Sequence, residues 1–92
     1  MICLLAYDIA DDKRRRKVVK ALEGAARRVQ YSVFEASLPE GQLRRLIRRT
    51  TGYLSMEEGD SLLVYRLCAS CAKRREGFGR QPVDWDSDVF VA

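Results

Sequence analysis

The residues best suited to chemistry stand near the start of the chain, where an apolar run ends in a carboxylate. Asp8 closes the stretch LLAYD, and Asp11 and Asp12 follow. A buried carboxylate is costly unless a cation or donor meets it, whereas Mg²⁺ takes one or two carboxylates and keeps several waters. One aspartate per chain makes a poor site, but two copies across a two-fold axis would suffice. Asp8 is therefore a candidate Mg²⁺ ligand; alternatively, it caps the next turn or pairs with an arginine.

The chain contains no histidine, so the usual general base near neutral pH is missing. Ser-His-Asp and Cys-His arrangements are therefore excluded within this chain. Hydrolysis would therefore have to rely on carboxylates and a metal ion. Asp11 and Asp12 are better interpreted as helix caps.

Positive charge is concentrated in the middle of the chain. Residues 13–49 carry twelve Lys and Arg against three Glu, a local charge of +9, while the whole chain has +4. Arginine outnumbers lysine thirteen to four. The planar guanidinium suits phosphate oxygens better than a point charge does, so this excess favours nucleic acid or another polyanion over a merely solvated helix face. Base-specific reading has little support, because the aromatic residues are scattered.

Three cysteines, Cys3, Cys68 and Cys71, cannot all pair within one chain. An odd count without a secretory signal indicates a reducing cytoplasm, and no apolar run approaches the ~20 residues of a membrane span. Cys68 and Cys71 form one CxxC, which is half of a four-ligand zinc site. The favoured interpretation is a half-buried pair at a strand end; a zinc site between chains and a redox pair are the alternatives.

Hydrophobic periodicity predicts a chain of alternating strands and helices. Residues 2–9 and 61–69 are short apolar strands, while 27–38 is rich in β-branched and aromatic residues and long enough to hide a bend. Helices are predicted over 11–26 and 40–54, the second with Pro39 in its first turn. Residues 70–82 form a loop or short helical turn, and 88–92 form a last strand.

This order predicts one α+β domain over residues 1–92, with residues 72–92 as an irregular segment and final strand. Taken literally, the order βαβαββ departs from the even βαββαβ pattern, because only one strand stands between the two helices. A bend within 27–38 would restore that pattern. We therefore expect a ferredoxin-like sandwich, in which helices cover one face of an antiparallel sheet.

Three stretches, AYDIADDKRRRKV, RRVQYSVFEASL and SLLVYRLCASC, resemble the CRISPR-associated Cas2 family in order and spacing. This family is the small companion of the CRISPR spacer integrase. The resemblance covers residues 2–71, and RVQYSVFE after a basic first helix is its most specific part. Residues 72–92 match only loosely.

The resemblance implies a tight homodimer in which the final strand of each chain extends the partner's sheet. It assigns Asp8 as the Mg²⁺ ligand and catalytic residue. It makes the basic residues Arg14, Arg15, Arg16 and Arg28 candidate nucleic-acid contacts. Ser32 and Phe34 lie in the motif that the family places near the two-fold axis.

The resemblance also implies two functions. One is a bridge between integrase dimers during CRISPR spacer acquisition, which needs a rigid two-fold body and a basic track for duplex DNA. The other is a Mg²⁺-dependent endonuclease acting on single-stranded RNA or double-stranded DNA. One Asp per chain favours the bridge over the nuclease. A toxin-like messenger-RNA endoribonuclease, or a free-standing nucleic-acid-binding module of the same fold, is the outside alternative.

Overall fold

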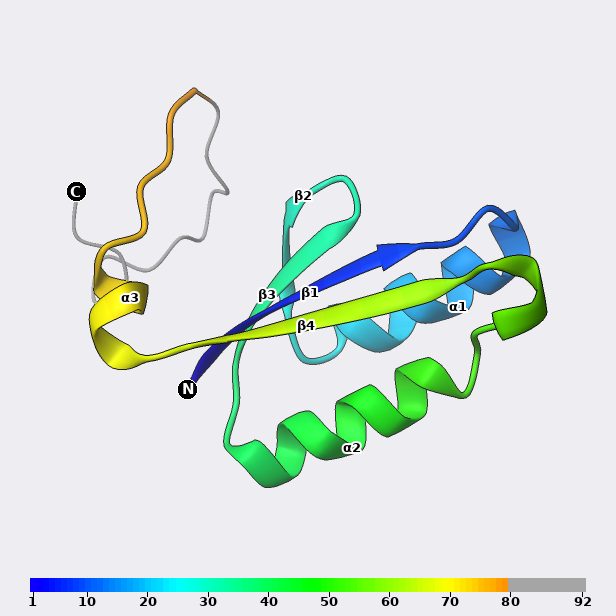
Figure 1. Cartoon of the computed structure of the whole chain (residues 1–92), viewed down its shortest axis with the longest axis horizontal. Coiled ribbons are helices and arrows are strands. Elements are labelled where there is room, and N and C mark those ends of the chain that lie inside the picture. Colours follow the sequence, from blue (N-terminus) through cyan, green and yellow to red (C-terminus); the bar gives the residue numbers. More distant parts are fainter. Residues whose placement is uncertain (80–92) are drawn as a thin grey trace.

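The structure, a computed structural model, describes residues 1–79, whose four strands form one antiparallel sheet (Figure 1). The elements are β1 (Ile2–Asp8), α1 (Asp12–Glu23), β2 (Arg27–Gln30), β3 (Val33–Ser37), α2 (Glu40–Thr51), the 3-10 turn η1 (Met56–Glu58), β4 (Ser61–Leu67) and α3 (Ala69–Lys73). The strand order is β2-β3-β1-β4, which places β1 in the centre beside β3 and β4. The predicted βαββαβ sandwich is confirmed. The predicted strand over 88–92 lies outside the described residues.

The segment 27–38 does contain the expected bend. It forms the hairpin of β2 and β3, joined by a turn at Tyr31 and Ser32, and the pairing register shifts between Arg28 and Gln30. The backbone N–H of Tyr7 donates to the carbonyl of Ser32 at 3.0 Å, which ties this turn to the end of β1. No glycine, proline or asparagine marks the turn, so its position was not readable from residue type.

Both long helices begin where a polar or rigid residue stops the preceding extended chain. Asp11 caps α1, its carboxylate accepting from the backbone N–H of Arg14 at 2.8 Å. The helix ends at Glu23, three residues before the predicted end, because Gly24 stands at its C-cap. Pro39 occupies the N-cap position of α2 rather than its first turn, and Gly52 ends that helix.

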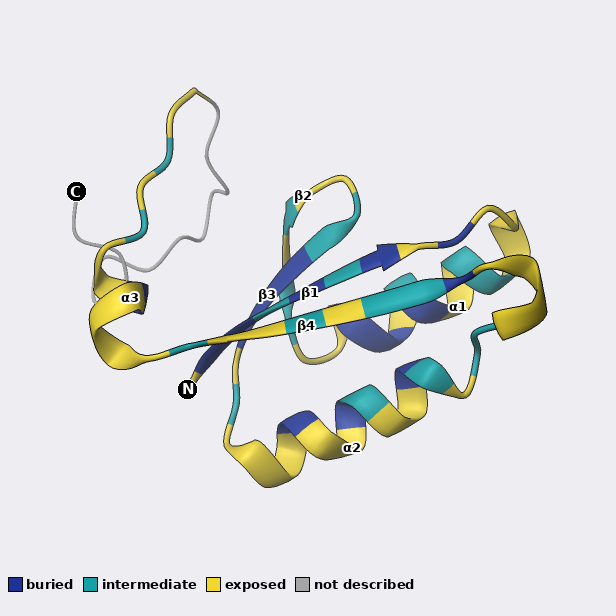
Figure 2. Ribbon diagram, viewed as in Figure 1, coloured by how far each residue is buried: buried dark blue, intermediate teal, exposed yellow. Residues whose placement is uncertain are grey.

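The core lies between the helices and one face of the sheet. Alternate residues of β1, namely Cys3, Leu5 and Tyr7, are buried on this face together with Phe34 of β3. The helices close it with the buried residues Val18, Leu22, Leu43 and Leu46. Figure 2 shows burial concentrated on the inward sides of both helices and along the central strands. Neither α1 nor α2, at 12 residues each, is a candidate membrane span, and no other described helix is longer.

The short helix α3 follows β4 directly and begins at Cys68, which is its N-cap. It confirms the helical turn expected within 70–82. Its Ala72 is buried, whereas Cys68 and Cys71 are both exposed. The prediction of a half-buried cysteine pair is therefore wrong: both residues are exposed where α3 begins, and Ala72 is the residue of α3 that packs inward. Cys3 is the buried cysteine.

Candidate nucleic-acid interface and carboxylate site

Asp8 is the last residue of β1 and is exposed. Side chains alternate along the strand, so Asp8 points to the same face as Leu4 and Ala6, opposite the helix-covered core. It pairs in register with Ser61 at the start of β4. The following residue, Ile9, is buried and anchors the chain as it leaves the sheet. The structure thus places the carboxylate at one end of the sheet face opposite α1 and α2.

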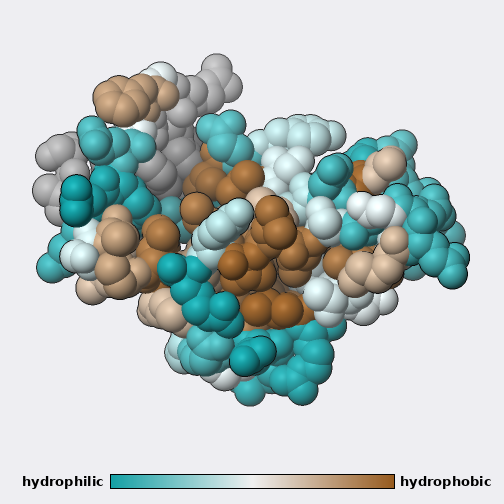
Figure 3. Space-filling model, in the orientation of Figure 1, coloured by the Kyte–Doolittle hydropathy of each residue, from teal (hydrophilic) through white to brown (hydrophobic). Residues whose placement is uncertain are grey.

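This open face of the sheet is apolar along β1 and β4. The register aligns Leu4 with Tyr65, and Ala6 with both Leu63 and Val33. Leu63 is 53% exposed and Tyr65 is 56% exposed. Figure 3 shows hydrophobic side chains gathered over the middle of the molecule in this view. A contiguous apolar face beside an exposed carboxylate is typical of an interaction surface.

The residues beside Asp8 do not complete a metal site within one chain. Among residues 1–79 no group of three or more His, Cys, Asp or Glu side chains could hold a metal ion. Mg²⁺ bound by protein needs one or two carboxylates plus waters or phosphate oxygens. Asp8 by itself therefore does not make a Mg²⁺ site within residues 1–79.

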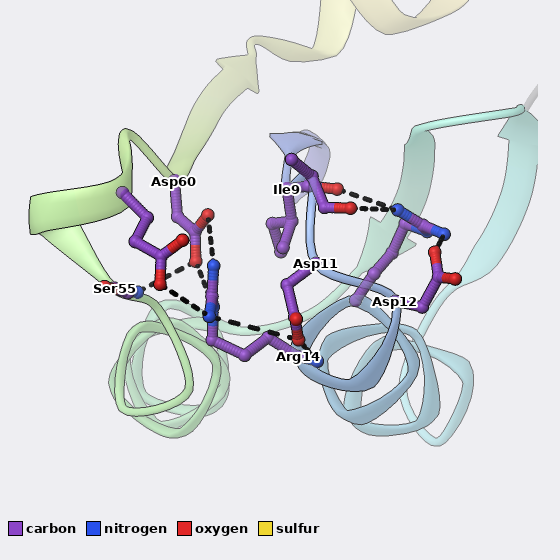
Figure 4. Close-up of polar contacts among 9 residues, drawn as sticks. Ile9, Asp11, Asp12, Arg14, Ser55 and Asp60 are labelled. Carbon is purple, nitrogen blue, oxygen red and sulfur yellow. Dashed lines mark hydrogen bonds and ion pairs between the residues drawn. The ribbon is translucent and has the colours of Figure 1, made fainter.

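Arg14, one of the predicted nucleic-acid contacts, is engaged with the chain's own acids (Figure 4). Its Nε donates to Asp60 Oδ2 at 2.8 Å, and its outer nitrogens reach the other Asp60 oxygen at 3.3 Å and Glu58 at 3.4 Å. The Asp60 side chain is 1% exposed and also accepts from the backbone N–H of Ser55 at 2.8 Å. The Arg14 guanidinium, helped by that N–H, holds the pKa of Asp60 below its usual range. Arg14 thus fastens α1 to the turn before β4.

Arg15 braces the exit of β1. Its guanidinium donates to the carbonyls of Ile9 at 2.9 Å and Ala10 at 3.3 Å, and it forms an ion pair with Asp12 (Figure 4). The hydrogen bond with Asp12 raises the pKa of Arg15. These contacts fix the two residues that follow Asp8. Arg15 therefore links the carboxylate end of β1 to the basic helix.

A groove beside α1 gathers the remaining predicted contacts. It has a volume of about 510 Å³, and its lining includes Arg15, Arg16, Lys20, Arg28 and Tyr31. Arg28 lies with its guanidinium carbon 5.3 Å from the centre of the Phe34 ring. Tyr31 is 71% exposed at the hairpin turn, and the Tyr7 hydroxyl donates to its carbonyl at 3.2 Å. The structure thus brings three of the four predicted arginines together and adds Lys20 and Tyr31, which were not predicted. Arg14 is not among the lining residues.

The outward faces of the two helices extend this positive surface. Both helices pack on the same sheet face, and their exposed cations are Lys13, Arg16, Lys17 and Lys20 on α1 and Arg44, Arg45, Arg48 and Arg49 on α2. Glu40, in the first turn of α2, forms ion pairs with Arg44 at 3.3 Å and with Arg66 at 2.9 Å. Arginines spaced along exposed helix faces suit a run of phosphates rather than one anion.

The two residues of the predicted axis motif differ in position. Ser32 is half-buried in the hairpin turn, whereas the Phe34 side chain is fully buried against the helices. The neighbours Val33 and Glu35 alternate to the open face. Glu35 is 4% exposed there and forms an ion pair with Arg75, which follows α3. No pattern in the sequence indicated this pair, because its members lie forty positions apart.

The comparisons with known proteins agree with the geometry. The family described as CRISPR associated protein Cas2 matches residues 1–75. The CRISPR-associated endoribonuclease Cas2 1 of Chloroflexus aurantiacus is 41% identical over 92 residues, covering 99% of both chains. The CRISPR-associated endoribonuclease Cas2 2 of Synechocystis sp. is 48% identical over 89 residues, covering 96% of this chain and 95% of the relative.

Two solved structures share the fold. Streptococcus pyogenes Cas2 superposes with a TM-score of 0.72 and 32% identity, covering 86% of this chain and all of the other, 100%. A chain from a partial Cas6-RT-Cas1–Cas2 complex superposes with a TM-score of 0.71 and 26% identity, covering 90% of this chain and 96% of that one. Matching sequence motifs, sheet order and length together establish that the chain belongs to the CRISPR-associated Cas2 family.

Proposed function

We propose that this chain is a homodimeric nucleic-acid-binding subunit of CRISPR spacer acquisition, which bridges the dimers of a spacer integrase. The observation that carries the proposal is the division of the molecule into two surfaces: a basic one formed by α1, α2 and the adjoining groove, and an apolar one formed by the open sheet face. A relative of the same fold is part of a Cas1–Cas2 complex, which supports an integrase partner.

The dimer accounts for the open face. Leu63 and Tyr65 leave more than half of their surface in water, and burying apolar area stabilises by about 25 cal/mol per Å². A second copy presenting the same face would cover both sets of side chains and bring the two Asp8 carboxylates toward one axis. In this proposal the final strand, which lies outside the described residues, extends the sheet of the partner chain.

The basic surface holds the duplex backbone. Arg16 and Arg28 are exposed and share the groove, so they serve as direct phosphate contacts. Arg14 and Arg15 contribute positive charge, but their guanidinium groups already hold Asp60 and the Ile9 carbonyl. Such binding is tolerant of sequence and weakens steeply with salt, because bound phosphates release counterions. Double-stranded DNA is the preferred ligand in this proposal, and single-stranded RNA is the alternative.

Charge reversal tests this proposal. Arg16→Glu with Arg28→Glu is expected to weaken duplex DNA binding at least tenfold and to flatten its salt dependence, measured by fluorescence anisotropy between low and moderate salt. Lys73→Glu with Arg74→Glu, two exposed cations at the end of α3, is the control with the same change in net charge. Equal losses in both variants would leave only a general charge effect and contradict a defined basic surface.

A second function, Mg²⁺-dependent cleavage of phosphodiester bonds, is favoured by the exposure of Asp8 and by the relatives named endoribonucleases. Asp8 from both chains would hold the ion, which when bound supplies a Lewis acid and an activated water. Membership of the Cas2 family favours these CRISPR-associated roles over the toxin-like alternative.

Asp8→Asn separates the two functions. If Asp8 is catalytic, the substitution lowers the rate of RNA or DNA cleavage at least a hundredfold and leaves the thermal stability unchanged. Chelation of Mg²⁺ then abolishes the wild-type activity. Integration assays with the partner integrase then compare the same two proteins. Full integration by Asp8→Asn would show that bridging does not require the carboxylate, and cleavage that survives the substitution would exclude Asp8 as the catalytic residue.

A further inference from the structure

The CxxC at the end of β4 has no role in the proposed function. Cys68 ends the extended chain and caps α3, while Cys71 stands one helical turn later. Both side chains are exposed, and the two thiols lie close enough for each to shift the pKa of the other. Two accessible sulfurs in a CxxC can take part in thiol–disulfide exchange.

The two thiols are unequal. The Ser70 hydroxyl lies 3.3 Å from the Cys68 sulfur and, together with the Cys71 thiol, lowers the pKa of Cys68 to about 7. The contact with Cys68 raises the pKa of Cys71, because a deprotonated Cys71 could no longer donate its S–H to the Cys68 sulfur. Burial raises the pKa of Cys3, whose side chain has no exposed surface. Cys68 is thus the nucleophile among the three, since the thiolate is the attacking species.

A hollow opens beside Cys68. It has a volume of about 590 Å³ and an apolar floor that includes Ile2, Leu67 and Ala72, with Arg66 and Lys73 also in its lining. Arg66 is held by Glu40 at 2.9 Å, whereas Lys73 is exposed at the end of α3. A small molecule entering this hollow would meet a nucleophilic sulfur, an apolar wall and a cation.

We propose that Cys68 and Cys71 form a thiol–disulfide exchange site for an anionic low-molecular-weight disulfide, of which glutathione disulfide is the representative. The Cys68 thiolate attacks one sulfur of that disulfide, forming a mixed disulfide and releasing one thiolate. The Cys71 thiol then loses its proton and attacks the Cys68 sulfur, which closes the Cys68–Cys71 bond and expels the second thiolate. The chain loses two electrons and two protons, and one small disulfide becomes two thiols.

Mass spectrometry of the intact chain under non-denaturing conditions tests the order of attack. With glutathione disulfide at neutral pH, the wild type is expected to lose two hydrogens without retaining glutathione. Cys71→Ser is expected to retain one glutathione on residue 68. Cys68→Ser is expected to react about tenfold more slowly, since an unperturbed thiol has a few per cent of its thiolate at this pH. Cys3→Ser should behave as the wild type.

Two further comparisons test the surroundings. Ser70→Ala is expected to slow the first step several-fold, and Lys73→Ala is expected to slow reaction with glutathione disulfide more than reaction with neutral hydroxyethyl disulfide. Equal trapping by Cys68→Ser and Cys71→Ser would overturn the assignment of nucleophile. A disulfide between two chains, seen on non-reducing gels, or one Zn²⁺ held by four thiols of two chains, seen by metal analysis, would overturn the proposal itself.

Discussion

The two faces of the sheet contrast in how far one chain satisfies them. The helix-covered face encloses Phe34, Leu5 and Leu22 with no exposed surface, and the helices carry their cations outward. The open face leaves Leu63 and Tyr65 in water. A chain of 92 residues buries a modest core, so the covered face supplies the stability of the protomer while the open face is available for association. One sheet thereby separates folding from assembly.

The largest expected effect concerns the covered face. Phe34→Ala removes a fully buried ring, and such truncations destabilise by about 3–5 kcal/mol, measured by urea denaturation. Leu63→Ala on the open face should lower the free energy of unfolding of the isolated protomer by less than about 1 kcal/mol, because little of the Leu63 side chain is buried there. Similar losses at both positions would abolish the distinction between the two faces.

The next effect concerns association through the open face. Leu63→Asp is expected to weaken the proposed dimer at least thirtyfold, because two carboxylates would be desolvated in an apolar interface. Analytical ultracentrifugation over a range of concentrations measures this loss. Met56→Asp is the matched control, since Met56 is 70% exposed but lies in η1, away from the sheet. A dimer that survives Leu63→Asp would place the interface elsewhere.

The smallest effect concerns the ion pair that joins the covered face to the start of β4. Asp60 has a lowered pKa in the fold, so its contribution to stability is present above its unfolded pKa of about 4 and is lost as the pH falls through the lower folded value. Asp60→Asn is expected to lower Tm by roughly 5 °C at pH 7, with a difference that shrinks at acidic pH.

Arg14→Gln should reproduce that pH dependence, because Arg14 is the main cause of the shift. A Tm difference for Asp60→Asn that stays constant from neutral to acidic pH would show that the pair does not set the pKa of Asp60. Thermal scans across that range in the same buffer series provide the measurement.

The sequence predicted the elements whose patterns are local. The apolar run of β1 and the stripe of Val18 and Leu22 on α1 are such patterns, and both were confirmed. The turn at Tyr31 and Ser32 was located only as a bend, because tyrosine does not mark a turn and a lone serine marks one only weakly. The length of the 27–38 segment and the βαββαβ pattern indicated the hairpin that propensity alone left as one long strand.

The candidate site was less predictable, because its contacts join distant parts of the chain. Asp8 was predicted from its place at the end of an apolar run, and the groove arginines were predicted through the family resemblance. The partnership of Arg14 with Asp60 spans 46 positions and carries no local signal. The ordinary expectation for a CxxC at a strand end was partial burial, whereas both residues are exposed where α3 begins. Such features depend on tertiary packing, which residue type does not specify.

The position of Arg15 has a mechanical consequence. Its guanidinium restrains the carbonyls of Ile9 and Ala10, yet the same side chain also lines the groove where a polyanion would dock. A phosphate that competes for this guanidinium would weaken its hydrogen bonds to the Ile9 and Ala10 carbonyls, so the backbone immediately after Asp8 would become more mobile. Binding of a polyanion along α1 would then be coupled, through the Arg15 side chain, to the mobility of the Asp8 carboxylate at the end of β1.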